Sequence, residues 1–285
     1  MSEKTIKKIK EKKCIIISAV LIVLIVLIAP GLYNGLCIQK YQIEDERINN
    51  TVRIAHISDL HSCKYGREQE KLIKAIDSQK PDIILMTGDM FDERTDDENT
   101  EYFLQNIYKK YPCYYIMGNH EYYCGSEIYA EITAMLEKYG ITVLSGETET
   151  VTLNDEKINI CGVDDPYSYL IGKNTNINTQ LKNISKQTEN GYFTILLSHR
   201  PELFETYTKY NFDLILCGHA HGGQWRIPGI LNGLYAPNQG IFPEYAGGLY
   251  EENDTTMIVS RGLSNYLPLC PRIYNRPELC IIDLI

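Results

Sequence analysis

Outside its N-terminal segment this chain of 285 residues has no basic tract, and that absence limits what it can bind. Its formal net charge is −9, with 37 acidic against 28 basic residues. A protein that grips duplex DNA or RNA through the phosphate backbone needs clustered lysine and arginine side chains. We therefore expect no nucleic-acid partner, and a nuclease that needs a basic groove is disfavoured.

The chain also lacks internal repeats and any C-x-x-C cysteine pair. Its nine cysteines are an odd number without a pairing pattern, which is typical of small buried hydrophobic side chains. A disulfide remains open, if the compartment is oxidising, between two of Cys113, Cys124, Cys270 and Cys280. The composition, 44% hydrophobic and 23% charged, is that of a globular protein, and the residues after the first fifty suffice for one domain.

The N-terminus holds the one long apolar run. From Ile15 to Leu32 nearly every residue is apolar, which is about long enough to cross a bilayer. Six lysines precede the run: Lys4, Lys7, Lys8, Lys10, Lys12 and Lys13. The positive-inside bias then predicts a cytoplasmic segment at 1–14, a single-pass transmembrane helix at 15–33 and a body outside the cytoplasm.

A cleaved signal peptide is the main alternative, because the apolar run is at the short end for a membrane span. The segment Ala29-Pro30-Gly31 is a poor cleavage site. A bacterial lipoprotein site would need a small residue before Cys37, where Leu36 stands. We therefore favour an uncleaved anchor, followed by a polar linker at 34–50.

After the linker, strand and helix signals alternate along the chain. Apolar and β-rich runs predict strands at 52–57, 82–87, 113–117, 141–144, 193–197, 214–217, 256–260 and 279–284, and a hairpin at 148–153 and 157–163. Helical periodicity predicts helices at about 67–79, 99–111, 126–139 and 179–188. Strands and helices alternate in the first part of this region, and hairpins follow in the later part. This order predicts one α/β domain over 51–285 with mixed sheets.

Five of the six histidines fall in four short motifs, and polar residues stand just past the ends of five predicted strands. These residues are Asp59, Asp89, Asn119, His199 and His219. In α/β sheets ligands gather outside the carboxyl ends of the strands. Imidazole, carboxylate and amide ligands together suit Mn²⁺, Fe or Zn²⁺ better than Ca²⁺. The pattern therefore predicts a metal site at this edge, with enough ligands for two ions.

The motifs resemble those of the calcineurin-like metallophosphoesterase family: D-x-H, G-D-x-x-D, G-N-H-[DE], a lone His and G-H-x-H. Here they read Asp59-Leu60-His61, Gly88-Asp89-Met90-Phe91-Asp92, Gly118-Asn119-His120-Glu121, His199 and Gly218-His219-Ala220-His221. Segments 221–224, 234–237 and 260–263 resemble the membrane-associated bacterial branch of the family. The resemblance implies two mixed β-sheets packed as a sandwich flanked by helices, and a hydrolase acting on phosphoester bonds.

The resemblance also implies two divalent metal ions (Mn²⁺, Fe²⁺/³⁺ or Zn²⁺) with Asp89 as a shared ligand. The other ligands would be Asp59, His61 and His221 for one ion, and Asn119, His199 and His219 for the second. The ions would activate a water molecule that attacks phosphorus. His120 would contact a phosphoryl oxygen or protonate the leaving group.

Other residues allow two interpretations. Arg200 and Arg261 could each grip a phosphate through paired hydrogen bonds, or form structural ion pairs. Asp92 could orient a metal ligand or be a plain surface carboxylate, and His56, inside a strand, is expected to be structural. The long segment Gln224–Tyr250, with the only tryptophan, could cover the site or pack over the sheet edge.

The leading hypothesis is a membrane-anchored phosphoesterase whose active domain lies outside the cytoplasm. An anchor near the bilayer favours a lipid-linked phosphate or pyrophosphate as substrate, although the fold itself cannot choose among phosphoesters. The alternative is a catalytically silent binding or scaffold module on the same fold. That alternative predicts lost ligands, and every motif residue is present here.

Overall fold

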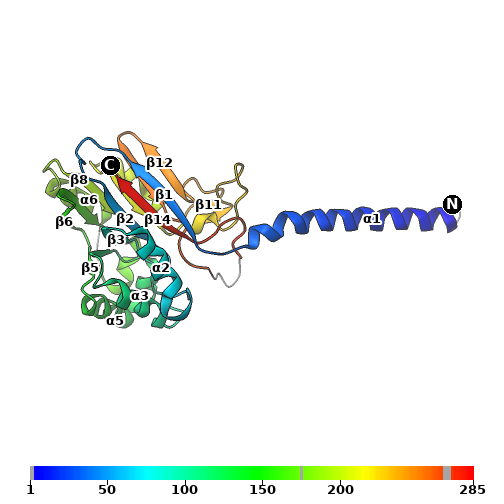
Figure 1. The fold of residues 1–285 in the computed structure, drawn as a ribbon, viewed down its shortest axis with the longest axis horizontal. Helices are drawn as coiled ribbons and strands as arrows, with labels where there is room; N and C mark the ends of the chain where they lie inside the picture. The colour runs from blue at the N-terminus through cyan, green and yellow to red at the C-terminus, as the bar shows by residue number, and fades with distance from the viewer. Residues whose placement is uncertain (1–2, 174–175, 266–270) are drawn as a thin grey trace.

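The computed structural model describes residues 3–173, 176–265 and 271–285. Over these residues the main strands form two six-stranded sheets, and one long helix extends from the body (Figure 1). Both sheets mix parallel and antiparallel pairs, as the alternating strand and helix signals predict.

The first sheet has the strand order β1-β14-β2-β3-β4-β5. Its strands are β1 (Cys37–Ile43), β14 (Glu278–Leu284), β2 (Val52–Ile57), β3 (Ile83–Met86), β4 (Cys113–Tyr115) and β5 (Thr142–Val143). Only the β14–β2 pair is antiparallel among the described pairs of this sheet. The carboxyl ends of β2, β3 and β4 therefore meet at one edge.

The second sheet has the order β12-β13-β9-β8-β7-β6. Its strands are β12 (Gly248–Glu252), β13 (Thr255–Val259), β9 (Leu214–Cys217), β8 (Phe193–Leu197), β7 (Glu156–Gly162) and β6 (Glu147–Leu153). Antiparallel hairpins close both sides, β12 with β13 and β6 with β7, around parallel inner strands. A small separate pair consists of β10 (Tyr235–Ala236) and β11 (Gly240–Ile241).

The core lies in three layers, because both sheets bury both faces. Alternate residues of β2 show this: Val52 and Ile54 pack between the sheets, whereas Ala55 and Ile57 pack against helices. The first sheet is covered by α2 (Glu70–Gln79), α3 (Glu98–Ile107) and α5 (Gly125–Lys138), and the second by α6 (Ile177–Gln187) and α7 (Phe204–Tyr207). The result is a β-sandwich flanked by helices.

Short helical segments complete the body. They are α4 (Asn119–Tyr123) and the 3₁₀ turns Ala29–Leu32, Arg67–Gln69, Pro166–Ile171, Pro201–Leu203 and His221–Gly223. The projecting helix is α1 (Glu3–Ile28), on which the described apolar side chains from Ile15 onward, Ile15 and Ile16 among them, are exposed. Judged by length and hydropathy, no helix within the described ranges qualifies as a membrane span.

The structure differs from the sequence predictions in two segments. Residues 34–50, predicted as a polar linker, contain β1, whose side chains alternate between half-buried and exposed. The segment Gln224–Tyr250 holds β10, β11 and the start of β12. The thiols of Cys113, Cys124 and Cys280 are free, and Cys270 lies outside the described residues.

Candidate metal centre

The predicted metal ligands converge at the carboxyl ends of strands from both sheets. Asp59 and His61 follow β2, Asp89 follows β3, Asn119 begins α4 after β4, His199 follows β8, and His219 and His221 follow β9. All seven side chains are buried. Seven polar residues of this kind are rarely buried together without an ion or a dense hydrogen-bond network.

Two groups of ligand atoms form within this cluster, and Asp89 belongs to both. The first group is Asp59, His61, Asp89 and His221, and the second is Asp89, His199 and His219. Within each group the ligand atoms lie within 4.8 Å of one another. The carboxylate of Asp89 thus stands where one residue can serve two cations.

Several ligand atoms have no hydrogen-bond partner among the described residues, although they are buried. They are His61 Nε2, Asp89 Oδ2, Asn119 Oδ1 and His199 Nε2. The Asp89 Oδ2 atom lies 3.1 Å from His199 Nε2 and 3.7 Å from His61 Nε2. An unsatisfied buried polar atom costs about 1–3 kcal/mol, so a site with four of them needs a compensating ligand. Neutral and anionic acceptors together fit a divalent cation.

Outer hydrogen bonds turn the imidazole rings toward the centre of the cluster. His61 Nδ1 donates to Asp92 Oδ2 at 2.9 Å, and His199 Nδ1 donates to the Thr87 carbonyl at 2.6 Å. These partners imply that Nδ1 carries a proton in each ring, and they turn Nε2 toward the centre of the cluster. Asp92 therefore contacts the predicted ligand His61 from behind, which favours the orienting role over a plain surface carboxylate.

The charges of the cluster are strongly coupled. Burial alone would raise the pKa of Asp89, but the neighbouring His199, His120 and His61 together outweigh burial and hold it well below its usual range. Burial opposes protonation of His199, yet the Asp89 carboxylate raises its pKa to about 10. Burial lowers the pKa of His221 well below its ordinary value, and the neighbouring His61 lowers it further. A cation that binds here must displace the His199 proton, so binding releases protons.

The loops that carry the ligands adopt a rare backbone conformation. The φ angle is positive at Asp59 (52°), His61 (47°), Asp89 (51°), His219 (66°) and His221 (47°). Residues other than glycine seldom adopt this region, at a cost of about 1–3 kcal/mol each, and such residues cluster at functional sites. Hydrogen bonds between the loops keep the backbone in this conformation. One of them runs from the His61 N–H to the Asp89 carbonyl at 3.0 Å.

Glu121 braces the Asp89 loop, a role that the sequence analysis did not predict. Its carboxylate is fully buried and accepts hydrogen bonds from the backbone N–H groups of Asp89 (3.0 Å) and Gly118 (2.7 Å). Its other oxygen accepts from two further backbone N–H groups of the same loop and from the Tyr115 hydroxyl. The motif Gly118-Asn119-His120-Glu121 thus supplies a predicted ligand, Asn119, and also the residue that supports Asp89, which is Glu121.

Comparison with known proteins identifies the family. The family model described as calcineurin-like phosphoesterase matches residues 52–223. The chain belongs to this family. A metallophosphoesterase of Aquifex aeolicus is 31% identical over 256 residues, which cover 87% of this chain and 91% of that protein. The phosphodiesterase YaeI of Escherichia coli is 26% identical over 238 residues, which cover 82% of each protein.

A solved structure shows the same fold. The 5'-nucleotidase precursor of Thermus thermophilus aligns with a TM-score of 0.54 at 15% identity, over 75% of this chain and 49% of that one. At this identity the likeness concerns the fold alone. Family membership makes this calcineurin-like protein a phosphoester hydrolase with the α/β metallophosphoesterase fold.

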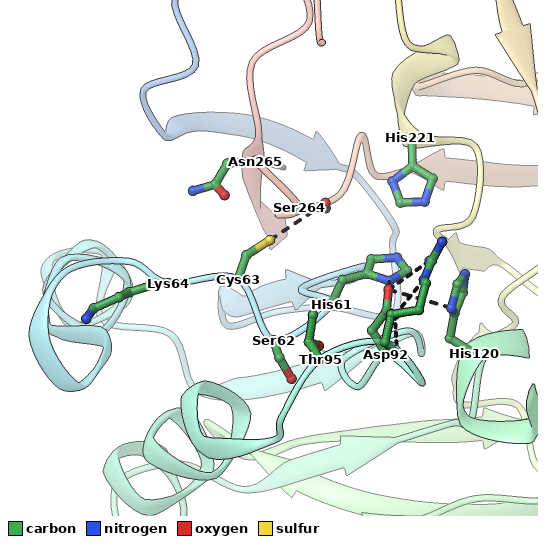
Figure 2. A pocket seen from close by; sticks show the side chains of 11 residues that line it. His61, Ser62, Cys63, Lys64, Asp92, Thr95, His120, His221, Ser264 and Asn265 are labelled. Carbon is green, nitrogen blue, oxygen red and sulfur yellow. Dashed lines mark hydrogen bonds and ion pairs between the residues drawn. The ribbon is translucent and has the colours of Figure 1, made fainter. Parts of the chain in front are cut away.

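The phosphoesterase has a pocket of about 460 Å³ beside the ligand cluster (Figure 2). His61, His120 and His221 line it on the side of the metal ligands. Lys64 also lines it, and so do Arg94 and Asp92, which form an ion pair with each other at 2.9 Å. The pocket therefore offers an anion the ligand cluster and the lining residue Lys64.

His120 occupies the pocket wall without joining either ligand group. Its Nδ1 atom lies 2.6 Å from Glu93 Oε2 and 3.8 Å from Asp92 Oδ2, and its ring centroid lies 4.5 Å from that of His61. Glu93 orients the imidazole, although nothing in the sequence singled it out. The Nε2 atom is left as the ring nitrogen that can serve a substrate.

The two predicted phosphate-binding arginines of the phosphoesterase are engaged by carboxylates. Arg200 is buried and donates through two nitrogens to Asp165, one of these bonds measuring 3.0 Å. Arg261 pairs with Glu278, which also accepts from the Arg261 backbone N–H at 2.8 Å. These are the structural ion pairs named as the alternative, and a phosphate-binding role stays a prediction. His56 is buried, with Nε2 2.8 Å from Thr87 Oγ1.

Proposed function

We propose that this protein hydrolyses a phosphate ester or pyrophosphate bond by means of a water molecule activated at two divalent ions, such as Mn²⁺, Fe²⁺ or Zn²⁺. The observation that carries the proposal is Asp89, whose buried Oδ2 lacks a hydrogen-bond partner among the described residues and belongs to both ligand groups. When bound, the two metal ions supply positive charge that orients the phosphate and lowers the pKa of water.

The remaining chemistry falls to side chains of the pocket. Glu93 holds His120 Nδ1, so that His120 Nε2 can donate a hydrogen bond to a phosphoryl oxygen or a proton to the leaving group. Glu121 keeps the Asp89 loop in place while the substrate binds. Lys64, which lines the pocket, adds positive charge that attracts the substrate.

We further propose that the protein is anchored in a membrane by α1, with its body outside the cytoplasm. The support is the exposed apolar surface of α1, which includes Ile25 and Val26, and the six lysines that precede the apolar run. An active site held near a bilayer favours a lipid-linked phosphate or pyrophosphate. Proteolysis of intact cells and of inverted vesicles would show on which side the body lies.

The competing function is a catalytically silent binding module. Such a module has no need of grouped ligands, whereas six of the predicted ligands form the two groups described above, and His120 lines the adjoining pocket. The two functions differ in one measurable property, the turnover of a phosphoester in the presence of metal.

The test is hydrolysis of para-nitrophenyl phosphate and of its bis-ester by the full chain in detergent. The protein is stripped of metal and then refilled separately with Mn²⁺, Zn²⁺ or Fe²⁺. We expect activity that returns with metal and disappears in Asp89→Asn, whereas Asp254→Asn, which removes an exposed carboxylate, keeps it. Metal binding without turnover of either ester would point to a selective site and to lipid-linked phosphates as the next substrates. A chain that binds no metal would instead be the binding module.

A further inference from the structure

Six large apolar side chains are exposed on two neighbouring turns of the body. They are Trp225, Ile227, Ile230, Tyr235, Ile241 and Phe242, which we call the apolar loop surface. Ile230 is 83% exposed, Ile241 69% and Phe242 67%. Isolated exposed apolar residues are ordinary in proteins, but six on two turns that hydrogen bonds from Leu234 to Gly223 and from Phe242 to Leu234 link together indicate an interaction surface.

The backbone presents these side chains rigidly. Ile227 pairs with Leu231 in an antiparallel bridge, which places Ile230 in the intervening turn. Tyr235 pairs with Ile241 across β10 and β11, and Phe242 follows. Residues 224–243 contain no aspartate or glutamate, so no carboxylate would lose its hydration if this surface entered an apolar phase.

Hydrogen bonds join the apolar loop surface to the base of α1. The Arg226 N–H donates to the Ile273 carbonyl at 2.9 Å, and the next residue, Tyr274, donates its N–H to the Gly31 carbonyl at 2.7 Å. Gly31 lies in the 3₁₀ turn that follows α1. Figure 1 shows the β10–β11 turns beside the point where α1 leaves the body. The surface therefore faces whatever surrounds the emerging helix.

The metal centre lies at the same end of the molecule. Cys37, the first residue of β1, pairs with Glu278, the first residue of β14, and β14 runs antiparallel to β2. The last residues of β2, which precede the ligand Asp59, therefore lie at the end where α1 departs. Asn275 connects the two regions, because its Nδ2 donates to the carbonyls of His221 (2.7 Å) and Gln224 (3.1 Å).

From these observations we propose that the apolar loop surface rests in the headgroup region of a lipid bilayer and turns the metal-centre edge toward it. The inference depends on the proposed anchoring by α1. A single helix would leave the body free to tilt, whereas a second apolar contact beside the helix base fixes its orientation. Tryptophan and tyrosine are the residues that favour this interface, because each combines an apolar ring with a polar group. The pocket then opens toward phosphates at the membrane surface.

Trp225 makes the proposal directly testable, because it is the only tryptophan of the chain. The full chain is reconstituted into phosphatidylcholine vesicles with either normal or brominated acyl chains, which quench tryptophan on contact. We expect brominated lipid to remove about half of the Trp225 fluorescence or more. The double variant Ile230→Asp and Phe242→Asp should lose most of this quenching, whereas Ile128→Asp, on α5, should retain it.

Flotation of the vesicles on a density gradient separates the two proposals. A chain that floats with vesicles but whose fluorescence brominated lipid leaves unchanged would overturn the apolar contact and keep the anchor. Equal quenching of the wild type and the double variant would also overturn it, once circular dichroism shows that both are folded. A chain that does not float would refute the anchor itself, and with it the orientation inferred here. The hydrolase activity is measured separately with para-nitrophenyl phosphate, and none of these results depends on it.

Discussion

Replacement of Glu121 by glutamine should weaken both the fold and the metal centre. The side chain is fully buried and accepts hydrogen bonds from five donors among the described residues. Two of these donors, the N–H groups of Asp89 and Gly118, point to Oε2, and the other three point to Oε1. A glutamine can present only one acceptor oxygen, so its NH₂ group must face at least two donors.

The magnitude follows from the number of bonds lost. A hydrogen bond to a charged group contributes about 1.5–3 kcal/mol, so Glu121→Gln should lower the free energy of unfolding by roughly 3–6 kcal/mol. Tyr115→Phe removes a single donor, at 2.7 Å, and should cost about 1.5–3 kcal/mol. Glu137→Gln is the matched control, because Glu137 is exposed on α5 and its replacement should change the free energy of unfolding by less than about 0.5 kcal/mol.

Urea unfolding followed by far-ultraviolet circular dichroism gives the free energies, and isothermal titration with Mn²⁺ gives the affinity. Because Glu121 holds the Asp89 backbone, the Glu121→Gln variant should also bind Mn²⁺ more weakly. If this variant unfolded within about 1 kcal/mol of wild type and bound Mn²⁺ equally well, the bracing role of Glu121 would be refuted.

Two further predictions concern residues near the site. Burial holds the pKa of His56 at about 3, so its contribution to stability is complete above pH 6.5 and declines as the pH falls. Between pH 7 and 5 the free energy of unfolding should drop by about 2 kcal/mol through His56, and His56→Gln should remove this part of the slope in urea titrations. Asp92→Ala should lower Mn²⁺ affinity by about 10- to 100-fold in calorimetry, because His61 loses its orienting partner. An unchanged affinity would exclude that role.

The predicted ligands could be placed near one another from the sequence because their positions follow from strand ends. The strands Val52–Ile57, Phe193–Leu197 and Leu214–Cys217 have the predicted bounds, since both faces are covered and each apolar run ends where a buried polar motif begins. Residues just beyond such ends meet at one edge whenever the strands are parallel. Asp59 and Asp89, which follow the parallel neighbours β2 and β3, could therefore be brought together without knowledge of any side-chain contact.

Residues that support the ligands could not be found this way. Glu93 stands in the acidic and basic run at 92–94, which is typical of a solvated loop, yet it contacts His120. The sequence shows Glu121 only as the last residue of a motif. Its role could not be predicted, because its partners Asp89 and Met90 lie some thirty positions earlier in the chain. Nor does a sequence pattern reveal left-handed backbone at ligands such as Asp59, since tertiary hydrogen bonds impose it.

The misread segment at 34–50 leads to a last prediction about β1. Its exposed residues alternate with half-buried ones, as expected of an edge strand with one wet face, and its polar composition resembles a linker in sequence. Yet β1 pairs along its whole length with β14, whose Glu278 N–H donates to the Gly262 carbonyl at 3.1 Å. Two residues on, the Ser264 N–H donates to the carbonyl of the ligand Asp59 at 2.6 Å.

A soluble chain of residues 34–285 should therefore fold and bind Mn²⁺, whereas residues 45–285 should be less stable. Loss of β1 removes two half-buried side chains, Tyr41 and Ile43, from the core between the sheets, which costs about 3 kcal/mol. It also exposes β14 as a new edge, so the support of Asp59 loosens and Mn²⁺ affinity should fall. Equal stability and affinity of the two chains in urea unfolding and calorimetry would show that β1 is dispensable. The segment between α1 and β2 would then be a linker after all, despite its pairing with the sheet.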